Sequence, residues 1–319
     1  MLLPLLLCLM GQFDLQKQVD ACNQLTACDI QIPYGTYVMS KPWNLRGKES
    51  LNIRAPIGTQ IIWWFDVAPS VCMDTIGTRN IKIEGPVFAL GNTSAKPDCL
   101  WIHGRGSDSK SQAILFLNAV KFQGWYNKAT VAFIAVENEE LHSVDFINAV
   151  PNTTALFLSR DNELGITSPF GIVNVNVVTM TSTNHNFYNC AFSHEGQVGN
   201  DKAFGITLGT GVHDLFIQGG STSQGSRGGV MRIAGENNRR ITVLSPNWES
   251  EEAKANIVID GNVFGLSIQF GFYQAKGPLL QVNGVAENVN LFPSEALTTS
   301  LLQVNGKLKN FTSVGICGK

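Results

Sequence analysis

The sequence predicts an all-β protein that folds as a single-stranded, right-handed parallel β-helix, a solenoid with rungs of about 22–26 residues. Three observations predict it: a short segment that repeats near the C-terminus, a glycine that recurs at nearly the same spacing, and a composition that favours strands and tight turns. In such a fold one rung cannot bury its own apolar face, so stability comes from stacking rung upon rung.

The repeat is clearest in the last forty or so residues. Residues 279–292 read LLQVNGVAENVNLF and residues 301–314 read LLQVNGKLKNFTSV, an offset of 22 residues with six consecutive identities. Upstream segments show the same order of apolar strand, glycine, short polar turn and second alternating strand. The recurring glycines stand 26, 26, 23 and 22 residues apart, at Gly209, Gly235, Gly261, Gly284 and Gly306. Three strands of four to six residues and three turns fill that length.

Composition supports strands and turns. Of the 319 residues 44% are hydrophobic, only 15% are charged, and 31 are glycine; ordinary soluble domains are roughly 25% charged. A β-sandwich would use Asp-Gly or Asn-Gly hairpins, which Asp260-Gly261 and Asn283-Gly284 fit locally. Their recurrence at one phase of the repeat favours a corner of a solenoid instead. Long amphipathic helices, which an α/β fold would need, are not evident.

Several classes of partner and cofactor are not indicated. The net charge is −2 and no basic run occurs, so we expect no nucleic-acid partner. The sequence has no zinc-ligand spacing, phosphate loop or GxSxG motif, so we expect no metal and no cofactor.

The chain divides into three expected parts. Residues 1–12 are apolar but too short to span a bilayer, and resemble a signal segment or a buried first strand. Residues 13–27 predict a capping helix with Leu15, Val19 and Cys22 near one face. Residues 28–319 form the β-helix, in which residues 159–184 are the least regular and predict an insertion beside a surface groove.

Seven cysteines leave the disulfide pattern open. If Cys8 is removed with a signal segment, six remain, which permits three disulfides in an exported protein. Cys22 and Cys28 are close enough in sequence to close a short loop. The alternative is that all six are buried free thiols.

The N-terminal stretch resembles a known superfamily. The expected capping helix is followed by IQIPYGTYVMSKPW (30–43) and LNIRAPIGTQIIW (51–63), and this order resembles the opening of the pectate-lyase-like right-handed β-helix proteins, among them phage tailspikes and polygalacturonases. The resemblance covers residues 13–63, while the rest of the chain matches only in the pattern of its rungs. It implies a secreted, extracellular or virion-surface protein that engages an extracellular polysaccharide.

The resemblance does not extend to the enzyme motifs. Family members that hydrolyse polygalacturonate carry NTD, paired Asp, GHG and RIK motifs, and the first two are absent here. The nearest counterparts of the others are Ser193-His194-Glu195-Gly196 and Met231-Arg232-Ile233-Ala234, which match poorly. Glycoside hydrolase, polysaccharide lyase and non-catalytic protein therefore stay open.

Candidate site residues follow from the phase of the repeat. Hydrolysis of a glycosidic bond needs two carboxylates about 5–10 Å apart, and adjacent rungs lie about 4.8 Å apart. Carboxylates at matching phase would meet this distance, and His194 or Arg232 could neutralise a uronic carboxylate or serve a lyase as base. Trp248 beside Glu249 is typical of an aromatic that stacks on a sugar. The predicted catalytic residues are Glu195, Glu249, Asp214, His194 and Arg232, and the predicted substrate-binding residues are Trp248 and Glu251.

Plainer roles compete with these. Glu249, Glu251 and Glu252 can form a solvated acidic loop, His194 and Glu195 can be turn residues, and Arg232 can be structural. The sequence thus supports two hypotheses: a protein that binds polysaccharide, with or without degrading it, or a non-catalytic structural or adhesive fibre, spike or coat protein. Stacked rungs also permit a homo-oligomer, as a trimer or fibre. Convergence of two carboxylates and an aromatic on one face would favour the first hypothesis.

Overall fold

The structure is a computed structural model of the 319-residue chain. It describes residues 14–22, 27–64, 71–90, 101–104, 114–124, 129–134, 138–148, 154–159, 167–168, 171–172, 182–193, 204–222 and 227–314. The predicted signal-like segment 1–12 and most of the irregular stretch 159–184 lie outside these residues.

Nearly all described strands belong to three long parallel sheets. Sheet A has 11 strands in the order β1 (Ala27–Gln31), β4 (Ser50–Arg54), β7 (Asn80–Glu84), β10 (Ile114–Asn118), β13 (Asn138–His142), β18 (Ser182–Tyr188), β21 (Val212–Gln218), β24 (Asn238–Leu244), β27 (Asn262–Gln269), β30 (Val285–Phe292) and β33 (Lys307–Ser313). Sheet B has 10 strands in the order β2 (Thr36–Met39), β5 (Gln60–Trp63), β8 (Val87–Leu90), β11 (Lys121–Gly124), β14 (Asp145–Asn148), β19 (Ala191–Ser193), β22 (Ser221–Thr222), β25 (Asn247–Ser250), β28 (Phe272–Ala275) and β31 (Glu295–Leu297). Sheet C has 10 strands in the order β3 (Trp43–Asn44), β6 (Met73–Asp74), β9 (Trp101–Gly104), β12 (Ala129–Ile134), β15 (Thr154–Ser159), β20 (Phe204–Leu208), β23 (Gly229–Ile233), β26 (Ile257–Ile259), β29 (Leu280–Val282) and β32 (Leu302–Val304).

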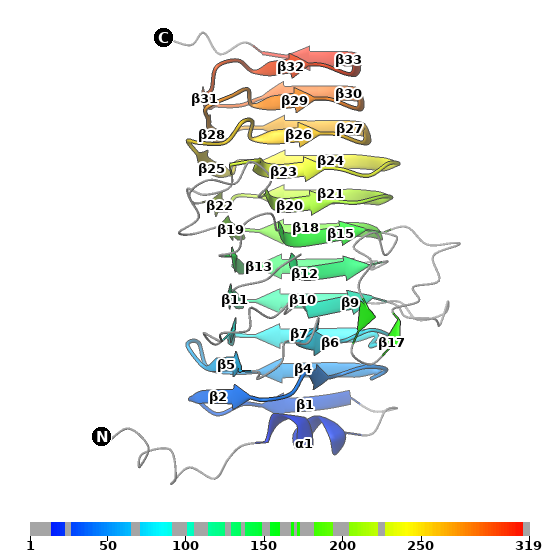
Figure 1. Ribbon diagram of the computed structural model, residues 1–319, viewed down its shortest axis with the longest axis vertical. Coiled ribbons are helices and arrows are strands. Elements are labelled where there is room, and N and C mark those ends of the chain that lie inside the picture. The colour runs from blue at the N-terminus through cyan, green and yellow to red at the C-terminus, as the bar shows by residue number, and fades with distance from the viewer. Residues whose placement is uncertain are drawn as a thin grey trace.

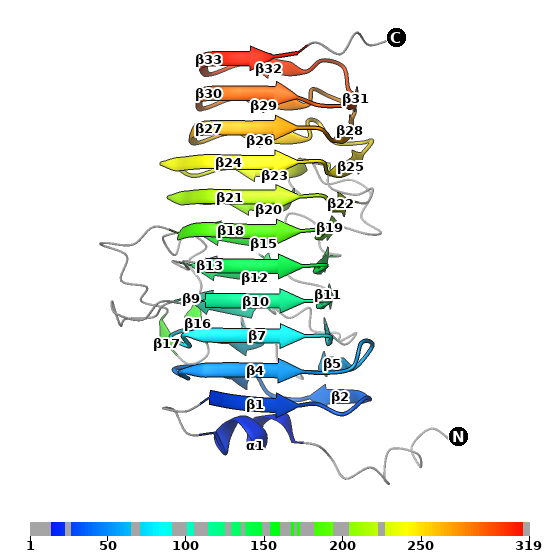
Figure 2. The ribbon, with the colours of Figure 1, turned by 180° about the vertical axis from the view of Figure 1, so that it is seen from behind.

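This topology is the predicted parallel β-helix. Each rung gives one strand to sheet A, one to sheet B and one to sheet C before the chain continues to the next rung, so β1 and β33 lie at opposite ends of a rod (Figures 1 and 2). The twin LLQVNG segments pair directly, with Leu280 beside Leu302 and Val282 beside Val304. Among the described strands only β16 (Thr167–Ser168) and β17 (Gly171–Ile172) pair antiparallel, which excludes a β-sandwich.

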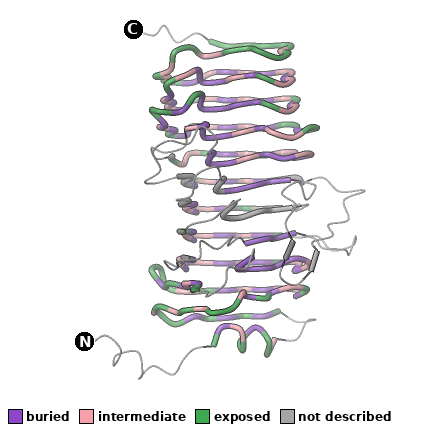
Figure 3. Tube along the Cα trace, viewed as in Figure 1, coloured by how far each residue is buried: buried purple, intermediate pink, exposed green. Residues whose placement is uncertain are grey.

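The core is a column inside the rod. Along most strands alternate side chains point inward and are buried, which Figure 3 shows as a repeating buried stripe. In sheet B four inward rings stack from rung to rung, with ring-centre distances of 5.7, 5.5 and 5.4 Å along Trp63, Phe88, Phe122 and Phe146. Trp63 is 3% exposed and its neighbour Trp64 is 50% exposed, as strand alternation requires.

The glycine period has a steric cause. A Cβ added to Gly235, Gly261, Gly284 or Gly306 would lie 2.0–2.3 Å from backbone atoms of the preceding rung. Real Cβ atoms do not approach backbone this closely, so each of these corners needs glycine. The regular spacing of these glycines in the sequence therefore results from the backbone of one rung packing directly on the backbone of the preceding rung.

The N-terminal end of the rod is capped. Helix α1 (Leu15–Asp20) begins after Asp14, whose side chain accepts a hydrogen bond from the Lys17 backbone N–H at 3.0 Å. Leu15 and Val19 are buried against the first rungs. No helix among the described residues is long and apolar enough to cross a membrane.

The pairing of the cysteines differs from both predicted alternatives. Cys22 and Cys28 form a disulfide that ties the end of α1 to β1, and Cys72 is also disulfide-bonded. Cys190 is a buried free thiol. The interpretation with three disulfides among the six cysteines is therefore wrong, and so is the one with six free thiols.

Candidate functional site

The predicted site residues come from all three sheets. Asp214 lies on β21 in sheet A, Glu249 on β25 in sheet B and Arg232 on β23 in sheet C. The three sheets face different directions, so outward side chains on them point apart. The structure does not bring these three residues together. His194 and Glu195 lie outside the described residues.

Trp248 has a different role from the predicted one. Its side chain is 0% exposed and packs edge-on against Tyr273 with ring centres 6.0 Å apart. A fully enclosed ring offers no face to a sugar, so we correct its predicted role to that of a core residue. Asn247 and Glu249 point outward on β25, so strand alternation turns Trp248, which lies between them, into the core.

Glu249 on β25 and Glu251 just after it stay on the surface. The Asn247 amide donates a hydrogen bond to Glu249 at 3.1 Å, and the Gln274 amide donates one to Glu251 at 3.3 Å. No aromatic platform among the predicted residues accompanies them once Trp248 is assigned to the core.

Arg232 and Asp214 are engaged in ion pairs. Arg232 Nε donates to Asp260 Oδ2 at 2.8 Å, and the guanidinium lies over the Phe204 ring at 5.6 Å. Arg240 holds Asp214 through two hydrogen bonds of 2.5 and 2.6 Å. These bonds hold the pKa of the Asp214 carboxyl below its ordinary value. A carboxylate stabilised in its ionised form is a poor general acid.

A staggered line of rings on the outer face of sheet A forms a better candidate. The register of β10, β13, β18 and β21 places Phe116 and Phe216 in one outward row, and His142 and Tyr188 in the outward row two residues further along the strands. We call Phe116, His142, Tyr188 and Phe216 the aromatic strip. Its ring centres lie 5.5 Å (Phe116 to His142), 4.8 Å (His142 to Tyr188) and 6.1 Å (Tyr188 to Phe216) apart. All four side chains are partly exposed.

Polar groups line the aromatic strip. His142 Nε2 and Glu140 Oε1 are 2.6 Å apart, with 36% and 52% of the two side chains exposed. Lys82 Nζ lies 5.2 Å from the centre of the Phe116 ring and 3.3 Å from Glu84. The strip thus joins aromatic faces to a carboxylate, an ammonium group and a phenol. This combination suits a ligand that has apolar faces and hydroxyl-bearing edges.

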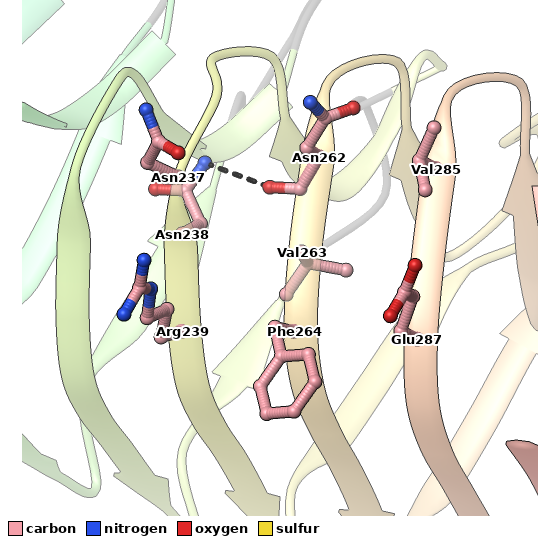
Figure 4. Close-up of a pocket in the computed structure, with 8 residues that line it drawn as sticks. All are labelled: Asn237, Asn238, Arg239, Asn262, Val263, Phe264, Val285 and Glu287. Carbon is pink, nitrogen blue, oxygen red and sulfur yellow. Dashed lines mark hydrogen bonds between the residues drawn. The ribbon is translucent and has the colours of Figure 1, made fainter. Parts of the chain in front are cut away.

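A pocket lies on the neighbouring strands of the same sheet. It has a volume of about 410 Å³ and is formed by the first residues of β24, β27 and β30 and the corners before them (Figure 4). Its lining residues are Asn237, Asn238, Arg239, Asn262, Val263, Phe264, Val285 and Glu287. Among the described residues no group of three or more His, Cys, Asp or Glu is placed to hold a metal ion.

Sequence analysis missed the aromatic strip because its spacing is irregular. Its four members stand 26, 46 and 28 residues apart, since rungs of different length intervene. One signal was available: buried Leu115 and Leu117 flank Phe116, so alternation alone makes Phe116 an outward aromatic. Which outward aromatics share a row depends on the register between rungs.

Comparisons with known proteins identify the fold. No protein-family model matches the chain, and no curated protein matches it. Among solved structures, ORF18 of Geobacillus virus E2 is similar with a TM-score of 0.55 at 10% identity, over 94% of this chain. The chain spans only 58% of the length of that phage protein.

Two Azotobacter vinelandii proteins are similar more distantly. The A-modules of mannuronan C-5 epimerases AlgE6 and AlgE4 each match at 10% identity over 94% of both chains, with TM-scores of 0.44 and 0.41. At this identity the likeness to the phage protein shows a shared architecture alone. The chain is thus a parallel β-helix whose function has to be argued from its own surface.

Proposed function

We propose that this protein binds an extended extracellular polysaccharide along the outer face of sheet A, with the aromatic strip as the main contact. The observation that carries the proposal is the line of four partly exposed rings, with neighbouring centres 4.8–6.1 Å apart, that runs across four successive strands of sheet A and alternates between two adjacent outward rows. A chain of pyranose rings presents one apolar face after another. A line of this kind can meet several of them at once.

The rigidity of the strip favours binding. The rings stand on strands that are hydrogen-bonded to neighbours on both sides, so little conformational entropy is lost when a ligand docks. Glu140 and the Tyr188 hydroxyl border the rings and can bond sugar hydroxyls. The Cys22–Cys28 disulfide is in keeping with a place outside the cell or on a virion surface.

The test is a binding assay with the full chain and a panel of neutral and acidic polysaccharides. We expect Tyr188→Ala combined with Phe216→Ala to weaken binding by about tenfold or more, because aromatic anchors dominate such contacts. Trp64→Ala is the matched control, since it removes an aromatic that is 50% exposed beside sheet B. Equal losses in both variants, or no binding by the unaltered protein, would refute the proposal.

Catalysis is a separate question that the same panel answers. New reducing ends would show hydrolysis, and ultraviolet absorbance of a new double bond would show elimination. Binding without either product would support the alternative, a non-catalytic adhesive or structural protein of a fibre, spike or coat. If products form, Glu140→Gln is the first variant to compare, because Glu140 is the exposed carboxylate within the strip.

A further inference from the structure

The pocket on β24, β27 and β30 has an aromatic floor between opposite charges. Register aligns Arg239 with Phe264 and Phe264 with Glu287 on three successive strands. Figure 4 shows the three side chains in one row, with Phe264 in the middle. Phe264 is 51% exposed, so its ring is available to a ligand. Arg239 and Glu287 stand two strand spacings apart, about 10 Å.

The guanidinium of Arg239 has no carboxylate partner among the described residues. The neighbouring charges are matched: Arg240 is bound to Asp214, and Lys309 Nζ lies 2.7 Å from Glu287 Oε1. Burial lowers the pKa of His213, which lies beside Arg239 in the row, so that imidazole is neutral at neutral pH. Arg239 is therefore the charged donor that a ligand in the pocket would meet.

A local backbone feature places Arg239 there. Arg240 has a left-handed backbone with φ of 52°, and this interrupts the alternation of β24. As a result Arg239 and Arg240 are both exposed, and Arg240 reaches Asp214 while Arg239 borders the pocket. Gly265, at the equivalent position of β27, has no side chain to fill the space beside Phe264.

From this geometry we propose that the pocket binds one carboxylated sugar unit of the polysaccharide, an inference that rests on the proposed function. The sugar ring stacks on Phe264, its carboxylate accepts two hydrogen bonds from the Arg239 guanidinium, and Glu287 accepts hydrogen bonds from its hydroxyls on the other side. An arginine fork matches a planar carboxylate in this way. The ligand of the whole outer face of sheet A is then an acidic polysaccharide. Its carboxylate binds in the pocket, and the faces of its sugar rings stack on the aromatic strip.

The experiment uses a uronic-acid oligosaccharide and the same oligosaccharide after reduction of its carboxyl groups to hydroxymethyl. The full chain should bind the acidic form about tenfold more tightly, as expected for a charge-assisted pair of hydrogen bonds. Arg239→Gln should abolish that preference, so that the acidic and reduced forms bind with about equal affinity. Arg239→Lys keeps the charge without the fork and should restore only part of the preference. Thermal unfolding of both variants is the check that they are folded.

The outcomes separate the two proposals. In one outcome the reduced oligosaccharide binds, Tyr188→Ala weakens its binding, and Arg239→Gln does not change the affinity for the acidic form. The proposed function then stands and the pocket assignment is wrong. If neither oligosaccharide binds, both fall. Tighter binding of a sulfated form of the reduced oligosaccharide than of the uronic acid would overturn the carboxylate assignment. A preference that Arg239→Gln removes supports it.

Discussion

The first and last rungs of the rod hold their register by different means. In the rungs of β1 to β9, polar side chains are buried, among them Lys48, Asp74, Thr75 and His103. Trp101 Nε1 donates to Thr75 Oγ1 at 2.8 Å, and Thr75 Oγ1 lies 3.0 Å from His103 Nδ1. Each of these contacts occurs once, so no period marks them in the sequence.

The cap joins this network. Lys48 Nζ donates hydrogen bonds of 3.2 Å to the backbone oxygens of Val19 and Cys22 at the end of α1. The ammonium group thereby donates to the Cys22 carbonyl beyond the helix end and adds a second donor to the Val19 carbonyl, which also accepts from the Cys22 backbone N–H at 3.1 Å. The N-terminal rungs are thus tied to their cap by a specific polar contact and a disulfide.

The last rungs also bury polar side chains, such as Asn238 and Asn256, but they add one contact that repeats. Glycine backbone packs on glycine backbone from Gly235 to Gly306, and an outer ladder links Asp260, Asn283 and Asn305 with hydrogen bonds of 2.7 and 2.9 Å. The comparison teaches that a solenoid can fix its register through unique buried polar contacts or through one repeated contact. Only the second leaves a visible repeat.

The strongest test of this comparison is Gly261→Ala. The added Cβ would lie 2.1 Å from the Gly235 backbone oxygen and 2.6 Å from the Ala234 backbone oxygen. These backbone atoms of the preceding rung cannot move aside, so we expect a loss on the order of 4 kcal/mol in the free energy of unfolding measured by urea, at the upper end for single substitutions. Hydrogen exchange should show the loss in the last rungs.

Gly47→Ala is the matched control in the N-terminal rungs. Gly47 has φ of 66°, and no atom lies within 4 Å of its added Cβ. The cost is then only that of a left-handed alanine, about 1–2 kcal/mol. Equal costs at the two glycines would contradict the steric explanation of the repeat.

Acid should weaken the N-terminal rungs through His103. Burial lowers the pKa of His103 to about 4 from its ordinary 6.5. Between pH 6.5 and pH 4, His103 is protonated in the unfolded chain but stays neutral in the folded chain. The free energy of unfolding therefore falls as the pH falls toward 4. The loss over that window is about 3 kcal/mol.

The measurement is urea unfolding across this pH range. His103→Gln should flatten the pH dependence, because glutamine does not titrate. An unchanged slope in that variant would assign the acid sensitivity to other groups and weaken the distinction between the two ends.

Removing the disulfide should have a smaller effect. Cys22 and Cys28 are six positions apart, and closing so short a loop restricts the unfolded chain by about 2 kcal/mol. The Cys22→Ser, Cys28→Ser double variant should lower stability by that amount, with faster hydrogen exchange in α1 and β1. Faster exchange in the last rungs would show that the two ends are not separable.

The smallest effect is expected for Asn283→Ala. Asn283 belongs to an exposed ladder, donating to Asp260 and accepting from Asn305. Exposed hydrogen bonds exchange readily with water, so we expect a loss of about 0.5 kcal/mol in the free energy of unfolding, measured by urea. A loss as large as that of Gly261→Ala would mean that the amide ladder, and not the glycine packing, sets the register.

The same contrast explains how far sequence analysis reached. The fold was predictable because glycines at one phase and the LLQVNG twins report direct rung-on-rung stacking. Local alternation requires one of the adjacent Trp63 and Trp64 to point inward, and the structure shows that it is Trp63. Short spacing suggested the Cys22–Cys28 pair. These features depend on residues that are near in sequence or separated by one rung.

The sequence by itself determined that the chain coils into stacked parallel strands. Strand alternation is visible within each strand, and the recurring glycines mark a backbone contact that only glycine allows. Only the tertiary structure decided which outward residues meet. Rungs of unequal length bring Phe116, His142, Tyr188 and Phe216 into one strip, and send Asp214, Glu249 and Arg232 to three different sheets. Which residues of two successive rungs lie side by side depends on the position of each corner in the sequence. The packing of the whole solenoid sets those positions.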